Sequence, residues 1–320
     1  MSYVSSATKN PGEPISLRSG LLWGLLGVTA FSFTVPLTRV AVQQGAMSPL
    51  FVGSGRAVIA ALLATAALAF TRQKLPRGSQ WARLLVVAGG VVVGFPLLTS
   101  FALTTAPASH GAVVIAVLPA ATAVVAVLRT RERPPIAFWI AAALGTSAAV
   151  IFAALQSGGL GVLHLSDLLL LGAVAAAAIG YAEGGLLARE LGAWQTVSWA
   201  LVASSPLMIA LAGASVVGHP PTGGRVEWAA FAYLAAVSMF LGFFAWYRGL
   251  ALGPMAQVSQ TQLVQPVMTI CWATVLLHEQ LSLPTVLGGL VIVGCALTAV
   301  RTRAGKRDVP TNTEVVHATR

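Results

Sequence analysis

The chain has 320 residues, of which 57% are hydrophobic and only 9% are charged. A soluble domain carries about 25% charged residues, so this composition excludes an ordinary water-soluble protein and predicts one that crosses a lipid bilayer several times. The net charge of +10 does not argue for a nucleic-acid partner, because basic residues flank membrane helices for topological reasons. Cys271 and Cys295 lie in apolar runs without a CxxC neighbour, and no metal-binding or nucleotide-binding motif stands out. We therefore expect no cofactor and no metal.

Ten apolar runs follow a polar start, and each is long enough to cross a membrane as a helix. In chain order these expected spans 1 to 10 cover residues 21–43, 49–70, 81–103, 107–128, 135–155, 166–189, 194–217, 227–250, 254–277 and 283–301. Residues 1–19 and 302–320 are polar, and we expect them to be disordered tails. The predicted fold class is an all-α polytopic membrane protein with ten transmembrane helices.

The placement of basic residues sets the orientation of these helices. With the N-terminus inside, sixteen Lys and Arg residues fall on the inner side and Arg225 alone falls on the outer side. Positive charge gathers on the cytoplasmic side of membrane proteins. We therefore predict a multi-pass protein of the cell's inner (cytoplasmic) membrane, with both tails in the cytoplasm.

Two stretches of the chain match each other at an offset of 147 positions, residues 107–132 and 254–279. The scarce residues that coincide are Pro107, Pro119 and Glu132 with Pro254, Pro266 and Glu279. We interpret the match as an internal duplication, with a first repeat at 20–155 and a second at 156–301. Because each repeat holds five spans, an odd number, the two must enter the membrane in opposite senses. This places Glu132 at the inner face and Glu279 at the outer face.

The pattern resembles the EamA-like branch of the drug/metabolite transporter superfamily. In that branch the fourth span of each half carries a mid-helix Pro and ends in a Glu, as residues 107–132 and 254–279 do here. A basic residue late in the first span, a Pro that opens the second and an Arg within it are matched by Arg39, Pro49 and Arg56. One departure is that Phe31-Ser32 stands where the family often has Trp-Gly. The resemblance implies a central cavity lined by spans 1, 3, 4, 6, 8 and 9, with spans 5 and 10 behind them.

We therefore expect a secondary active transporter, and an exporter rather than an importer, for a small organic solute such as an amino acid, metabolite or drug. Inverted repeats support alternating access around a site near the membrane midplane, and a proton is the leading coupling ion. An intramembrane enzyme and a passive channel are the alternatives; the first needs convergent His, Asp or Glu side chains at one depth. We expect a monomer or homodimer whose partners are the solute and the bilayer.

Span 9 holds the main candidates for the solute pathway. At 100° per residue, one helical face holds Gln257, Gln260, Thr261, Val264 and Met268, with Gln265 at its border. Gln262 falls on another face. An amide that faces lipid has no hydrogen-bond partner, at a cost of several kcal/mol, so we expect this face to line a cavity. The alternative is that the glutamines only join helices.

Glu183 is the carboxylate that lies deepest in an apolar run, and an acid within a membrane span is a candidate for ion coupling. It lies about 9 Å from the predicted inner boundary, so an ion pair with Arg189 or Arg248 is the alternative. His110 occupies the repeat position of Gln257 and is a candidate for pH sensing. A structural hydrogen bond is the alternative for His110.

The remaining candidates are two prolines, two aromatic residues and one arginine. Pro119 and Pro266 each remove a backbone donor near mid-membrane, so we expect kinks that shape the cavity, as hinges or as static bends. Tyr181 and Trp246 are candidates for the pathway, although an aromatic residue near a boundary also serves as an interfacial anchor. Arg56 lies about 10 Å inside the outer boundary, where it would bind an anionic group such as a carboxylate or extend outward to the surface.

Overall fold

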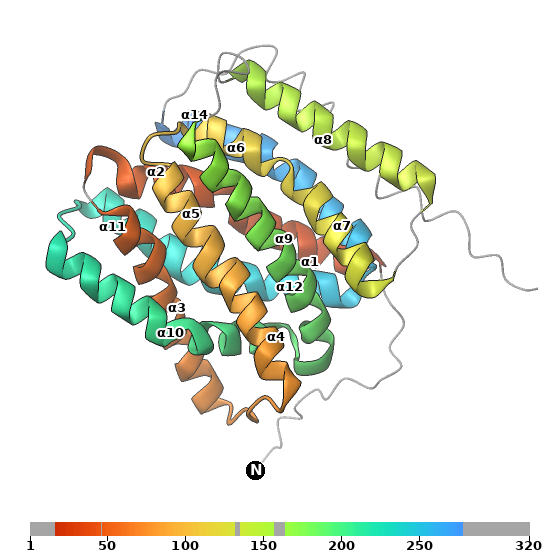
Figure 1. Ribbon diagram of the computed structural model, residues 1–320, viewed down its shortest axis with the longest axis horizontal. Coiled ribbons are helices and arrows are strands. Elements are labelled where there is room, and N and C mark those ends of the chain that lie inside the picture. The colour runs from red at the N-terminus through yellow and green to blue at the C-terminus, as the bar shows by residue number, and fades with distance from the viewer. Residues whose placement is uncertain (1–16, 46, 132–134, 157–163, 278–320) are drawn as a thin grey trace, which may run out of the picture.

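The computed structural model describes residues 17–45, 47–131, 135–156 and 164–277, and every regular element in these ranges is a helix (Figure 1). Six described segments are long and apolar enough to cross a membrane, in agreement with spans 1, 2, 3, 6, 7 and 8. They run over Leu17–Val42, Pro49–Phe70, Ser79–Ala102, Leu165–Leu191, Ala193–Gly218 and Arg225–Leu252. Span 10, Glu132, Glu279, residues 1–16 and the tail at 302–320 lie outside the described residues, and helix α1 begins at Leu17, within the predicted N-terminal tail.

The first five spans are built from short helical pieces as well as long helices. They are α1 (Leu17–Ser32), α2 (Thr34–Val42), the 3₁₀-helix η1 (Gln43–Gly45), α3 (Pro49–Phe70), α4 (Ser79–Val87), the π-helix η2 (Ala88–Gly94), α5 (Phe95–Ala102), α6 (Ala108–Ile115), α7 (Leu118–Thr130) and α8 (Ile136–Gln156). Span 1 is thus broken between α1 and α2, and span 4 between α6 and α7. Helix α8 lies at the edge of the bundle, where it packs against α6 and α7 (Figure 1).

The described spans of the second half follow the same order. They are α9 (Leu165–Leu191), α10 (Ala193–Gly218), α11 (Arg225–Tyr233), the π-helix η3 (Leu234–Leu241), α12 (Gly242–Leu252), α13 (Met255–Ser259), the 3₁₀-helix η4 (Gln260–Val264) and α14 (Gln265–Leu277). Shifted by 147 positions, η2 covers residues 235–241 and so coincides with η3. A π-helix is rare, and its occurrence at the same place in spans 3 and 8 supports the predicted duplication.

The helix contacts are reciprocal between the two halves, as an inverted duplication requires. Span 1 packs on span 8 through α1 and α12, and span 6 packs on span 3 through α9 and α5. Helix α13 packs on α7, while α14 packs on α6. Spans 4 and 9 therefore run antiparallel (Figure 1). Helices α7 and α14, which end at Thr130 and Leu277, therefore end at opposite ends of this pair.

Glycines allow the closest crossings between the halves. A side chain on Gly249 of α12 would place its Cβ 2.7 Å from the backbone nitrogen of Gly24 in α1. Where η2 crosses α9, a Cβ on Gly90 would overlap the carbonyl oxygen of Ala176 and lie 3.0 Å from the Cα of Gly180. Such backbone-to-backbone approach is typical of helices packed within a bilayer.

We expect Gly90→Ala to destabilise the fold, because the new methyl group meets the rigid backbone of α9. Overpacking of this kind costs about 1–3 kcal/mol, so the apparent melting temperature in detergent should fall by several degrees. The neighbouring Gly89→Ala is the matched control, since nothing lies within 4 Å of the position of its Cβ. Equal melting temperatures for the two variants would contradict the close crossing of η2 and α9 at Gly90.

Candidate functional site

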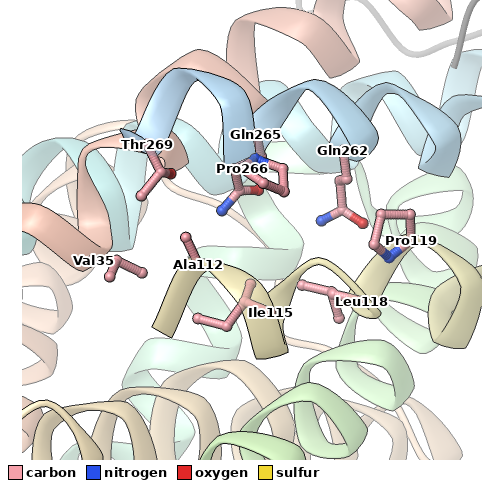
Figure 2. Close-up of a pocket in the computed structure, with 9 residues that line it drawn as sticks. All are labelled: Val35, Ala112, Ile115, Leu118, Pro119, Gln262, Gln265, Pro266 and Thr269. Carbon is pink, nitrogen blue, oxygen red and sulfur yellow. The ribbon is translucent and has the colours of Figure 1, made fainter. Parts of the chain in front are cut away.

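Two buried cavities lie between the halves and share one residue. The proline cavity is small, with a volume of about 10 Å³, and is lined by Val35, Ala112, Ile115, Leu118, Pro119, Gln262, Gln265, Pro266 and Thr269 (Figure 2). The arginine cavity has a volume of about 20 Å³ and is lined by Phe31, Thr34, Arg56, Val91, Phe95, Pro96, Tyr181, Ser238, Met239, Phe243 and Gln265. Together their walls come from the six spans that the resemblance implied, and span 2 adds Arg56. Gln265 lies where the cavities meet.

Breaks in spans 4 and 9 form the proline cavity. Pro119 and Pro266 are each the second residue of a helix, α7 and α14. A proline ring clashes with the carbonyl four residues earlier, and for Pro119 that residue is Ile115, the last of α6. At the expected kinks the structure has a two-residue turn at residues 116–117 in span 4 and a 3₁₀ segment in span 9. Both prolines face the same cavity (Figure 2).

The 3₁₀ winding of η4 changes which glutamines face the cavity. Gln262 and Gln265 point toward the break between α6 and α7 (Figure 2). Gln257, Gln260 and Thr261 are buried but line neither cavity of the described chain. A 3₁₀-helix turns about 20° more per residue than an α-helix, so the face predicted with α-helical spacing is wrong beyond Ser259. Gln257 and Gln260 each keep a buried amide atom without a hydrogen-bond partner among the described residues.

A contact between spans 1 and 9 closes the predicted outer half of the bundle. The break after Ser32 leaves a carbonyl oxygen free, and Thr269 donates a hydrogen bond to it at 2.9 Å. Trp272 Nε1 donates to the Ser32 hydroxyl at 2.9 Å, and the Trp272 ring stacks on Phe33 with centroids 4.2 Å apart. Ser32 thus links spans 1 and 9 by two hydrogen bonds. Its neighbour Phe31 lines the arginine cavity.

The arginine cavity combines a buried cation with aromatic walls. The Arg56 side chain is fully buried, with its residue 1% exposed, and its Nε and Nη2 have no hydrogen-bond partner in the described chain. Thr34 and Ser238 join their hydroxyls at 2.7 Å across the same cavity. Phe31 lies against Phe243 and Tyr181, with ring centroids 4.9 and 6.3 Å away. Arg56 therefore does not extend to the outer surface.

Glu183 is held at the predicted cytoplasmic end by two arginines from other spans. Arg129 of α7 binds its Oε2 through Nη2 at 2.5 Å and Nε at 2.9 Å, and Arg83 of α4 binds its Oε1. Arg83 also pairs with Glu190. The ion cluster of Arg83, Arg129, Glu183 and Glu190 thus ties spans 3, 4 and 6 together. The alternative partners that the sequence suggested, Arg189 and Arg248, are wrong.

Those two arginines have other contacts. Arg189 donates to the carbonyl oxygens of Leu250 and Gly253, and Arg248 lies over the Trp23 ring at 5.1 Å. The expectation that they neutralise Glu183 was drawn from nearness along the chain and from predicted depth. The partners in the fold come from spans 3 and 4, which the sequence does not place beside Glu183.

The other sequence candidates have different places. Tyr181 lines the arginine cavity. Trp246 is fully buried and packs against Gly24 and Gly27 of α1 instead of lining either cavity in the described chain. The side chain of His110 lies outside what the structure describes. No three His, Cys, Asp or Glu side chains gather into a metal site within the described ranges.

Inverted halves, broken spans and buried polar cavities define this molecule as a polytopic membrane transporter fold. The chain belongs to the EamA-like transporter family, whose sequence profile matches it twice, at residues 18–154 and 164–300. It is 42% identical over 283 residues to the uncharacterized transporter YdeK of Bacillus subtilis (strain 168), covering 88% of this chain and 97% of that protein. A solved structure described only as "Crystal structure of protein" shares the fold with a TM-score of 0.68 at 20% identity, over 89% of this chain and 97% of the other.

The changed face of span 9 leads to an accessibility test. In a background with Cys271→Ser and Cys295→Ser, we expect Gln262→Cys to react several-fold faster with a hydrophilic thiol reagent than Gln257→Cys. Both positions are buried, but only Gln262 lines a cavity. Faster reaction of Gln257→Cys than of Gln262→Cys would instead support the face predicted with α-helical spacing. Mass spectrometry of membrane vesicles gives both rates.

Proposed function

We propose that the chain is a secondary active transporter that exports a small organic solute, such as an amino acid, metabolite or drug, by alternating access. The observation that carries the proposal is the pair of polar cavities at the meeting of two inverted halves, beside breaks in spans 1, 4 and 9. Irregular backbone at membrane depth is tolerated only within protein or beside a water-filled cavity. In inverted-repeat transporters that is where solute binds.

Contacts at both ends of the bundle support a closed, occluded state. The ion cluster ties spans 3, 4 and 6 on the predicted cytoplasmic side. Thr269, Trp272 and Phe33 tie spans 1 and 9 on the predicted outer side. Alternating access requires that one set of contacts break while the other holds. We assign the ion cluster to an inner gate and the Ser32–Trp272 contacts to an outer gate, with Pro119 and Pro266 as hinges beside the cavity.

The two gates differ in chemistry, although the halves are related. At the 147-residue offset, Arg83, Arg129 and Glu183 fall on Ala230, Leu276 and Pro36. The three charges are therefore not repeated at the equivalent positions of the other half. This supports Glu183 as the site where a proton couples to transport, because protonation removes the charge that both arginines bind and so frees span 4 from span 6.

We expect Glu183→Gln to open the inner gate. With Ala126→Cys as reporter, one turn before Arg129 on α7, thiol modification in inside-out vesicles should be faster than in the parent. Glu190→Gln is the control, since it removes an exposed partner of Arg83 but leaves both contacts to Glu183. Equal reporter rates in the parent and Glu183→Gln would remove the cluster's role as a gate.

Transport itself is tested in proteoliposomes with an imposed pH gradient and a panel of labelled amino acids, organic acids and drugs. We expect saturable flux of at least one solute that follows the proton gradient, and loss of that dependence in Glu183→Gln. Flux that rises linearly with concentration would identify a passive channel. Saturable flux with the same pH dependence in both proteins would leave a transporter but end the proton role of Glu183.

A further inference from the structure

The feature that the gates leave unexplained is the buried charge of Arg56. A guanidinium stays protonated in proteins, and burial of a charge without a partner is strongly unfavourable. Neither a hydrogen bond nor an ion pair reaches Arg56 from the described residues, and its Nε and Nη2 are fully buried. Of the four described acids, Glu183 and Glu190 pair with Arg83, Asp167 accepts from the backbone of His164, and Glu227 lies in the first turn of α11 against Gly223 and Gly224. The positive charge of Arg56 is therefore uncompensated in this part of the chain.

The local fold fixes Arg56 in this position. Helix α3 begins at Pro49, and the Ser48 hydroxyl caps it by accepting a hydrogen bond from the Phe51 nitrogen at 3.0 Å. Arg56 lies two turns further on, about 10 Å into the helix. Small residues on α3 allow it to pack closely along α10. The side chain is thereby directed into the arginine cavity.

The rest of the cavity suits a solute with two kinds of surface. The same cavity is lined by the Thr34 and Ser238 hydroxyls and the Gln265 side chain, which can form hydrogen bonds. The rings of Phe31, Tyr181 and Phe243 provide an apolar wall. No carboxylate from the described residues lines the cavity, so nothing there would pair with a cationic group of the solute.

We propose that Arg56 binds the carboxylate of a small organic monoanion when the arginine cavity, which in this closed state has a volume of about 20 Å³, widens in the transport cycle, and that the apolar body of the solute then lies against Phe31, Tyr181 and Phe243. The planar guanidinium matches a carboxylate in a bidentate pair, and the pair removes the uncompensated charge from the membrane interior. This inference rests on the proposed transport function and specifies its substrate class. A zwitterionic amino acid should bind more weakly than the matching acid, because its ammonium group would lose water without gaining a partner.

The test measures binding to the purified protein in nanodiscs by calorimetry, using acids and their neutral amides. The probes are 3-phenylpropanoate with 3-phenylpropanamide and hexanoate with hexanamide, together with phenylalanine and chloride. We expect each acid to bind about tenfold or more tightly than its amide, as for hydrogen bonds to charged groups. Arg56→Gln should abolish this preference, and Arg56→Lys should retain part of it.

Arg248→Gln is the matched control, since it removes an exposed arginine from another helix. All variants are compared at equal monodispersity and melting temperature, so that misfolding is recognised. Absence of any preference for acid over amide, an unchanged preference in Arg56→Gln, or binding of chloride alone would overturn the proposal. Tighter binding of phenylalanine than of 3-phenylpropanoate would overturn the monoanion class.

The same proteins reconstituted in vesicles separate this proposal from the transport function. Saturable flux of a neutral or cationic solute that is unchanged in Arg56→Gln would reject the carboxylate site and leave the transporter. Acid-selective binding that depends on Arg56, without flux of any probe, would keep the site and reject the transport function. Acid flux that is saturable and lost in Arg56→Gln supports both.

Discussion

The constraint on which this structure depends is that a polar group inside a bilayer must find its partner within the protein. Spans 1 and 4 are interrupted, and span 9 winds as a 3₁₀-helix over Gln260–Val264, so backbone hydrogen bonding is irregular in all three. The three irregular segments lie around common cavities. The Ser32 carbonyl illustrates the solution, since the hydroxyl of Thr269 on another of these spans satisfies it. An irregular helix segment that would leave backbone groups unpaired by itself is therefore tolerated where another such segment supplies a hydrogen-bond partner. These segments meet around the cavities.

Charge follows the same constraint in two different ways. Glu183 is buried, with 4% of its surface exposed, and two arginines neutralise it. Removal of one member of such a group leaves the others unpaired, so the cluster holds three spans together while it is intact. Arg56 is buried just as deeply but has no described partner. One charge is thus compensated within the protein, as the proposed gate requires, and the other is uncompensated among the described residues, as the proposed carboxylate site requires.

Much of the architecture was predictable, because apolar runs and the repeated prolines can be recognised from short stretches of the sequence. The described spans end within a few residues of the predicted limits, and Pro119 and Pro266 both lie at the cavity. The cavity-facing side of span 9 was not predictable, because no sequence signal indicates that Gln260–Val264 form a 3₁₀-helix. The partners of Glu183 were missed for a different reason: Arg83 is 100 residues away, and the pairing depends on how spans 3 and 6 pack. The predicted membrane depth of Glu183 limits which arginines can pair with it. It does not distinguish between several arginines at the same depth.

Duplication and divergence have separate roles in this molecule. The repeated features are those of the backbone: the π-helices in spans 3 and 8, the prolines in spans 4 and 9 and the reciprocal contacts of spans 1 and 6. They place the cavities between two halves of opposite orientation. A movement of either half would open a cavity. The charged groups are not repeated, since Glu183 and its arginines fall on neutral residues in the other half. An inverted pair with identical ends would have no preferred side. The ion cluster lies at one end and an aromatic contact at the other, so the proposed protonation of Glu183 would act on one gate alone, which is the asymmetry that directed transport requires.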